Sequence, residues 1–172
     1  MRRVCLCDKI GYSYLISVDI YCVETIKFLC KFDYSMSKQF NTKLWNIGRQ
    51  IEDELKPKID DFFGCSFERS DNVFDVLDFH DENNKKIVEV KGRRNSSSQY
   101  PTTIITCGKI TEGLMRMEQD AELEVYYFFV FTDKTLYLKL DPQNCDFVMK
   151  RTGTAHIPHY LLPIKDLTEF GP

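Results

Sequence analysis

The chain has 172 residues, of which 43% are hydrophobic and 13% aromatic, so we expect one globular domain with a substantial core. Its net charge of −3 argues against a protein that coats nucleic acid through a strong overall positive field, but not against an enzyme with a local basic patch. The seven cysteines are an odd, scattered set, which argues against a disulfide framework and predicts an intracellular, reducing compartment such as the cytoplasm or a nucleus. Charged residues interrupt the apolar stretch 12–32, so no membrane association is expected.

The first 40 residues are the hardest part of the sequence to interpret and are expected to form an N-terminal appendage. Alternating apolar residues between Tyr14 and Ile20 suggest a strand within it. We expect a single domain over residues 1–172, with its core at 41–140 and a C-terminal extension at 141–172.

A helix is predicted over residues 41–63. Asn41 or Thr42 can cap it, and apolar residues then recur at helical spacing to build one face. Pro57 is expected to end or kink this helix, with one further turn before Gly64.

Alternation and turn residues predict the elements that follow. They are strands at 65–69, 73–80 and 85–91, a polar turn at 81–84, a loop at 92–103, a helix at 104–117, strands at 124–132 and 135–140, and a final strand or short helix at 157–167. Antiparallel strands between helices indicate an α/β fold, in which helices cover the faces of a central sheet.

A charged pair stands out in the otherwise apolar strand 85–91. Glu89 and Lys91 are two residues apart, so they project from the same face of the strand. An acidic residue of the preceding strand can reach the same point. Two carboxylates and a lysine at the end of a hairpin can hold a divalent metal beside a phosphate, which is the minimal set for phosphodiester hydrolysis.

This arrangement resembles the PD-(D/E)XK nuclease superfamily. The resemblance rests on the strand with Asp75, the hairpin turn and Glu89-Val90-Lys91, and it covers roughly residues 41–140. It implies a restriction-endonuclease-like core, with a central mixed sheet flanked by helices in the order α-β-β-β-α-β. Phe74 precedes Asp75 where the superfamily often has proline. The segment from Tyr100 to Thr103, followed by Lys109-Ile110, is also similar to restriction-like nucleases of large DNA viruses.

The resemblance implies a Mg²⁺-dependent DNA endonuclease, in which Mn²⁺ can substitute. Asp75, Glu89 and Val90 are assigned to the metal, and Lys91 to the attacking water. Two acids compete with Asp75: Asp78 is the main alternative, and Asp71 is better explained as a loop residue. Asp75 is favoured because it lies level with Glu89 in a symmetric hairpin.

Several further residues are expected around this site. Members of the superfamily often place a glutamate on the first helix, which makes Glu52 an auxiliary catalytic candidate beside its competitor Glu54. A lysine on the helix after the motif is a frequent helper, which selects Lys109. Contacts to DNA are expected from Arg93, Arg94, Gln99, Tyr100 and Lys109.

The expected partner is DNA, and a homodimer is compatible with an enzyme of this size that cuts both strands. The alternative function is a catalytically inactive restriction-like fold that binds nucleic acid or serves in assembly. The intact acid, Glu89 and Lys91 favour an active enzyme.

Overall fold

The computed structural model describes residues 2–7, 13–18, 42–70, 77–152 and 157–171. Its main feature is a six-stranded sheet in the order β11-β8-β7-β5-β4-β3. The strands are β3 (Glu68–Arg69), β4 (Phe79–Asp81), β5 (Lys86–Gly92), β7 (Glu124–Val130), β8 (Thr135–Lys139) and β11 (Thr168–Phe170). Strands β5 and β7 are parallel, and the other neighbouring pairs are antiparallel, so the sheet is mixed.

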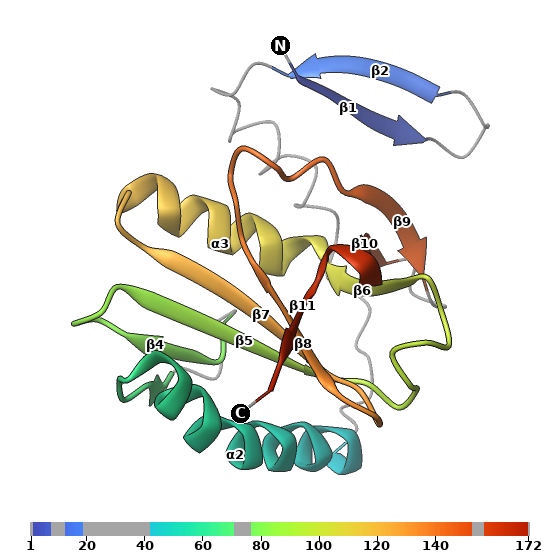
Figure 1. Cartoon of the computed structure of the whole chain (residues 1–172). Coiled ribbons are helices and arrows are strands. Elements are labelled where there is room, and N and C mark those ends of the chain that lie inside the picture. Colours follow the sequence, from blue (N-terminus) through green and yellow to red (C-terminus); the bar gives the residue numbers. More distant parts are fainter. Residues whose placement is uncertain (1, 8–12, 19–41, 71–76, 153–156, 172) are drawn as a thin grey trace.

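Two helices cover the main sheet on opposite faces (Figure 1). Helix α2 (Thr42–Phe63) buries Leu55 and Ile59 against one face, together with Val88 and Val90 of β5. Helix α3 (Cys107–Gln119) packs on the other face. This confirms the expected α/β architecture with a central multi-stranded sheet. None of the helices in the described ranges combines the length and the apolar character that a membrane span needs.

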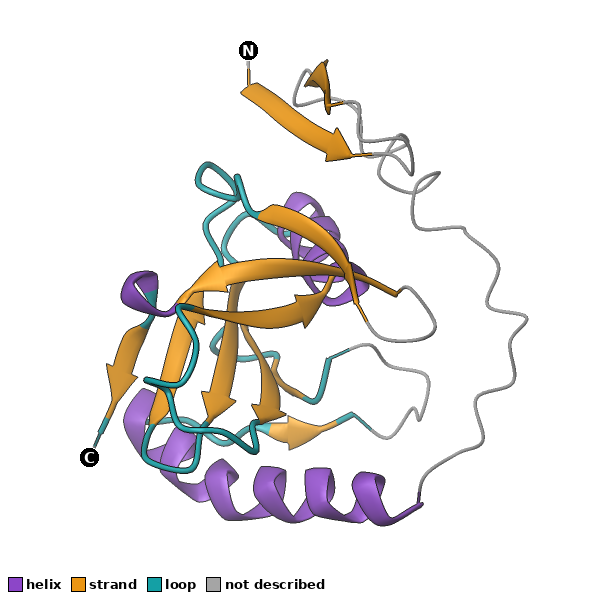
Figure 2. Ribbon diagram, turned by 90° about the vertical axis from the view of Figure 1, so that its right-hand side faces the viewer, coloured by secondary structure: helices purple, strands orange, loops and turns teal. Residues whose placement is uncertain are grey.

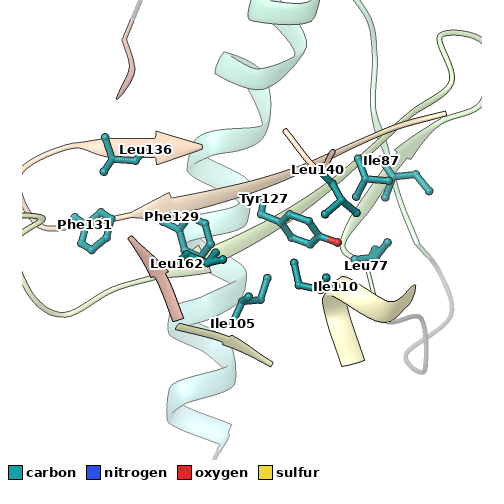
Figure 3. Close-up of a cluster of buried hydrophobic side chains, with 11 residues drawn as sticks. Leu77, Ile87, Ile105, Ile110, Tyr127, Phe129, Phe131, Leu136, Leu140 and Leu162 are labelled. Atoms are coloured by element: carbon teal, nitrogen blue, oxygen red, sulfur yellow. The ribbon is translucent and has the colours of Figure 1, made fainter. Parts of the chain in front are cut away.

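Buried apolar side chains form one core cluster between α2 and the main sheet and a second between α3 and the main sheet; Figure 3 shows the second. It joins Ile87 of β5, Tyr127 and Phe129 of β7, and Ile110 of α3. Strand β7 is buried along most of its length, as expected for a central strand. Residues 87 and 89 share the α3 side, whereas Val88 and Val90 face α2, so the alternation of β5 places Glu89 under α3.

Helix α2 confirms the predicted helix and continues through Pro57, so of the two outcomes expected at this proline, an end or a kink, the end is wrong. The buried residues Leu55 and Ile59 lie on either side of Pro57, and their packing offsets the hydrogen bond that proline cannot donate. Gly64 ends the helix with a φ of 63°, a left-handed conformation that glycine adopts without strain.

The predicted strand 65–69 is shortened to β3. The N–H of Cys65 donates to the carbonyl of Asp60 at 3.0 Å, and the N–H of Phe67 donates to the Asp60 carboxylate at 2.9 Å. These bonds complete the end of α2, so the first residues after the helix are not available for the sheet.

The segment 102–106 is a strand, not the end of a loop and the start of a helix. This strand, β6 (Thr102–Thr106), pairs with β10 (Ile157–Pro163), which also pairs with β9 (Val148–Thr152), and the three form a second sheet. The helix predicted from residue 104 therefore begins at Cys107. Strand β6 is rich in β-branched residues, and its partner lies about fifty residues away, which a local pattern cannot reveal.

The chain ends at the edge of the main sheet. After β10, a short 3₁₀ turn (Ile164–Asp166) leads into β11, which pairs with β8 (Figure 2). At the other end of the sequence, β1 (Arg2–Cys7) and β2 (Ser13–Val18) pair with each other, which confirms a strand in the N-terminal segment.

Candidate active site

Glu89 is the centre of the candidate site. It lies in the middle of β5 and is fully buried, with an exposed fraction of 0%. Lys91 contacts its Oε1 as an ion pair, and the Nζ of Lys109 donates to its Oε2 at 2.8 Å. Lys91 projects from the same strand face, as its spacing predicts, and Lys109 reaches the carboxylate from the first turn of α3.

Asp78 is the acid that the described structure brings to this place. Its carboxylate accepts a hydrogen bond of 2.8 Å from the backbone N–H of Val90, directly between Glu89 and Lys91. Phe79 pairs with Val88, so one further step of the same register puts Asp78 level with Glu89. Asp75 and Asp71 lie outside the described residues, and Asp75 stays a prediction.

The electrostatics of the site follow from burial. Burial raises the pKa of Glu89 to about 7; the charge of Asp78 adds to this rise, while Lys91 and Lys109 oppose it. Burial acts to lower the pKa of Lys91, but the negative charges of Glu89 and Asp78 outweigh it and raise this pKa. The site therefore keeps its lysine charged beside a carboxyl group that titrates near neutrality.

The donor set fits a magnesium ion. Mg²⁺ is commonly held by one or two carboxylates and keeps several waters, and the oxygens of Asp78, Glu89 and the Val90 carbonyl are donors of this kind. Glu89 Oε1 is buried. It forms an ion pair with Lys91 but accepts no hydrogen bond of normal geometry, so it is open to a further ligand. In the described ranges, no three His, Cys, Asp or Glu side chains gather into a metal cluster, so the fit rests on this smaller set.

Glu52, the auxiliary candidate on α2, is held by arginines. Its carboxylate forms ion pairs with Arg69 of β3 and, at 3.4 Å, with Arg49 one turn earlier. Arg69 also pairs with Asp53. These contacts give Glu52 a role in fastening α2 to β3, and its catalytic role stays a prediction. The side chain of its competitor Glu54 accepts a hydrogen bond from Gln50 on the exposed surface.

Arg93 turns inward, although the sequence predicts it as a contact to DNA. Its guanidinium donates to the hydroxyl of Thr103 at 2.9 Å and to the carbonyl of Ile104, and it lies 5.3 Å over the ring of Phe129. Burial lowers its pKa to about 10. Arg93 thus joins the end of β5 to β6 and is only partly exposed, and its contact with DNA stays a prediction.

The loop after Arg93 is well anchored and exposes three of the other predicted DNA contacts; the fourth, Lys109, lies on α3 and contacts Glu89. The backbone N–H and the hydroxyl of Ser97 donate to the carboxylate of Asp133 at 2.7 and 2.8 Å. Arg94, Gln99 and Tyr100 are exposed on this loop, Tyr100 to 56%. The Gln99 amide donates to the Tyr100 hydroxyl at 3.2 Å.

Sequence reasoning missed one residue of the site, Tyr127. Its hydroxyl donates to the backbone carbonyl of Lys109 at 3.0 Å, and it is paired with Glu89 across β5 and β7. The aromatic run 126–129 predicts a buried strand and masks this polar contact. A tyrosine, not a phenylalanine, inside such a run is the signal that could have revealed it, because a buried hydroxyl needs a partner.

A family model described as "Phage putative PDDEXK endonuclease" matches residues 45–155. The chain belongs to this family. The matched range includes Asp78, Glu89, Lys91 and Lys109, so the PDDEXK family covers the whole candidate site, and the resemblance inferred from the sequence is confirmed. Searches among curated proteins and among solved structures returned no match.

Proposed function

We propose that this member of the PDDEXK family is a Mg²⁺-dependent endonuclease that hydrolyses phosphodiester bonds in DNA, on a restriction-endonuclease-like core. The observation that carries the proposal is the buried carboxylate of Glu89 between Lys91 and Lys109, with Asp78 bonded to the adjacent backbone. Desolvating such a charged cluster is costly even when its members are paired, and carboxyl groups with pKa values perturbed in this way are concentrated at functional sites.

The metal would be held by Glu89, Asp78 and the carbonyl of Val90, with Asp75 as the alternative acid. When bound, Mg²⁺ would supply a positive charge that polarises the phosphate and the attacking water. Lys91 and Lys109 each contact one oxygen of Glu89, so a metal would either share this carboxylate with the two ammonium groups or replace one of them.

The two lysines have separate tasks in this proposal. The side chain of Lys91 is 32% exposed, so it can turn toward a water molecule and orient it by hydrogen bonding. Its positive charge can also lie close to the phosphate. Lys109 is 18% exposed and stays attached to a helix, so it fixes the orientation of the Glu89 carboxylate. Both cations also offset the negative charge that develops on the phosphoryl oxygens.

The exposed loop residues Arg94, Gln99 and Tyr100 are proposed to contact DNA. They follow the carboxyl end of β5, directly after the candidate site. Arg94 would contact phosphates without regard to sequence, while Gln99 and Tyr100 can reach sugars or bases.

The test is cleavage of linear, supercoiled, branched and single-stranded DNA by the purified full chain with Mg²⁺ or Mn²⁺. We expect Glu89→Gln and Lys91→Met to lower the cleavage rate about 10²- to 10³-fold or more, whereas Glu82→Gln on the exposed turn leaves it unchanged. Absence of cleavage on all four substrates, or full activity of Glu89→Gln, would overturn the proposal. DNA binding without cleavage would point to the non-catalytic alternative.

A further inference from the structure

We propose that Tyr127 is a positioning residue that fixes Lys109 onto Glu89 by anchoring the first turn of α3. Its consequence for cleavage rests on the proposed nuclease function. Its structural part, the coupling of Tyr127 to Lys109, does not.

The three residues form a closed circuit between two strands and a helix. Tyr127 lies beside Glu89 in the parallel register of β5 and β7. Its hydroxyl donates to the carbonyl of Lys109 at 3.0 Å, and the Nζ of Lys109 returns to Oε2 of Glu89 at 2.8 Å. Two neighbouring residues of the sheet thus hold Lys109: Tyr127 bonds its backbone carbonyl and Glu89 bonds its side chain.

Gly113 makes the approach of Tyr127 to α3 possible. A Cβ atom at Gly113 would lie 2.3 Å from the Tyr127 hydroxyl and 3.0 Å from Leu140 Cδ2. Glycine in a helix interior is unfavourable, so its presence here is explained by this close contact. Gly113 follows Lys109 by four residues, which in a helix is the next turn along the same face.

The hydroxyl of Tyr127 gives the first turn of α3 a side-chain contact, and this turn has no side-chain cap. Thr106, at the N-terminal cap, makes no side-chain capping bond, so the first helical turn is not fastened in the usual way. The Tyr127 side chain is fully buried, and burial followed by the charge of Glu89 raises its pKa well above the ordinary value. The phenol therefore stays protonated and donates to the backbone carbonyl of Lys109. Figure 3 shows the Tyr127 ring among the apolar side chains of the core cluster, which include Ile110 and Leu140.

Loss of the hydroxyl should let the first turn of α3 shift and loosen the contact of Lys109 with Glu89. Small displacements of positioned groups slow a chemical step strongly while leaving remote binding contacts intact. The effect should therefore appear in kcat and not in KM for DNA.

The experiment compares wild type, Tyr127→Phe, Lys109→Met and the double variant, with Tyr126→Phe as the matched control. Tyr126 also loses one hydroxyl bond, to Glu124 at 3.0 Å, but it belongs to the core cluster on the α2 side. We expect Tyr127→Phe to lower kcat about tenfold with KM unchanged, Tyr126→Phe to cleave like wild type, and Tyr127→Phe to have no effect when Lys109 is already Met. Wild-type kcat in Tyr127→Phe, or the same loss in the Lys109→Met background, would overturn the inference.

The same four proteins are compared in the equilibrium constant for unfolding, which needs no cleavage. Tyr127→Phe should raise this constant by one factor in wild type and by a smaller factor in the Lys109→Met background. The two factors should differ at least about threefold, because part of the effect of Tyr127 passes through Lys109. Additive changes would overturn the inference. A chain that shows this coupling but cuts no DNA would remove the proposed function and leave the positioning role of Tyr127 in place.

Discussion

The carboxylate of Asp78 accepts a hydrogen bond of 2.8 Å from the backbone N–H of Val90. This bond ties the residue before β4 to the centre of β5 and fixes one acidic side chain beside Glu89 and Lys91. The carbonyl of Val90, a candidate metal ligand, belongs to the same residue. The register of β4 against β5 therefore decides which aspartate lies beside Glu89 as the candidate metal ligand.

Asp78→Asn should weaken Mg²⁺ binding and abolish cleavage, because an amide is a poorer metal ligand than a carboxylate. Asp75→Asn should bind Mg²⁺ and cleave DNA like wild type. Isothermal titration calorimetry with Mg²⁺ and a cleavage assay on the two variants decide between them, and the reverse pattern would restore Asp75 as the ligand.

The stability of the metal-free protein should fall as pH rises from about 4.5 to about 7. The pKa of Glu89 is raised from 4.5 to about 7 by burial, so in this range the folded protein holds a proton that the unfolded chain has released. The loss amounts to roughly 3 kcal/mol at most, and Glu89→Gln should remove it. Urea titrations across this pH range, with Glu82→Gln as the control, measure the slope; an unchanged slope in Glu89→Gln would assign the titration to other groups.

Lys91→Met should separate metal binding from catalysis. Removal of the ammonium group frees Oε1 of Glu89, so Mg²⁺ affinity should be equal to or higher than in wild type. The cleavage rate should nevertheless fall about 10²-fold or more, because the water loses its positioning group. If Lys91→Met loses Mg²⁺ binding in calorimetry, Lys91 is a structural partner of the site and not the group that orients the water.

Arg93→Met should lower the stability of the fold, whereas Arg94→Gln should lower the affinity for DNA. Arg93 holds Thr103 and Ile104 and covers Phe129, so its loss should reduce the free energy of unfolding by about 2–3 kcal/mol. Arg94 is exposed, and its loss should lower DNA affinity and the salt dependence of binding, with little change in stability. Thermal unfolding and DNA titrations at several salt concentrations measure both; equal stability of the two variants would contradict the inward role of Arg93.

Local sequence patterns were sufficient for several elements. The apolar periodicity predicts α2, and the i, i+2 spacing predicts that Glu89 and Lys91 share a face, because both depend on the geometry of a single element. Lys109 was selected from the resemblance, and the structure brings it to Glu89.

Features that depend on distant segments escaped prediction. A roughly symmetric hairpin was expected to bring Asp75 level with Glu89. In the structure Asp81 pairs with Lys86, and continuation of this register puts Asp78 at that level. Strand β6 depends on β10, and the inward turn of Arg93 depends on β6 and Phe129. The contact of Tyr127 with Lys109 likewise requires knowing how α3 crosses the sheet.

The attachment of Ser97 to Asp133 has a consequence for the thermodynamics of recognition. A flexible loop loses conformational entropy when a partner orders it, and this loss weakens the complex. Here the two bonds from Ser97, and a third from the N–H of Thr132 to the carbonyl of Asn95, order the loop before any partner arrives. These bonds anchor the backbone that leads to Gln99 and Tyr100, so a partner that binds the two side chains would have less of the loop left to order.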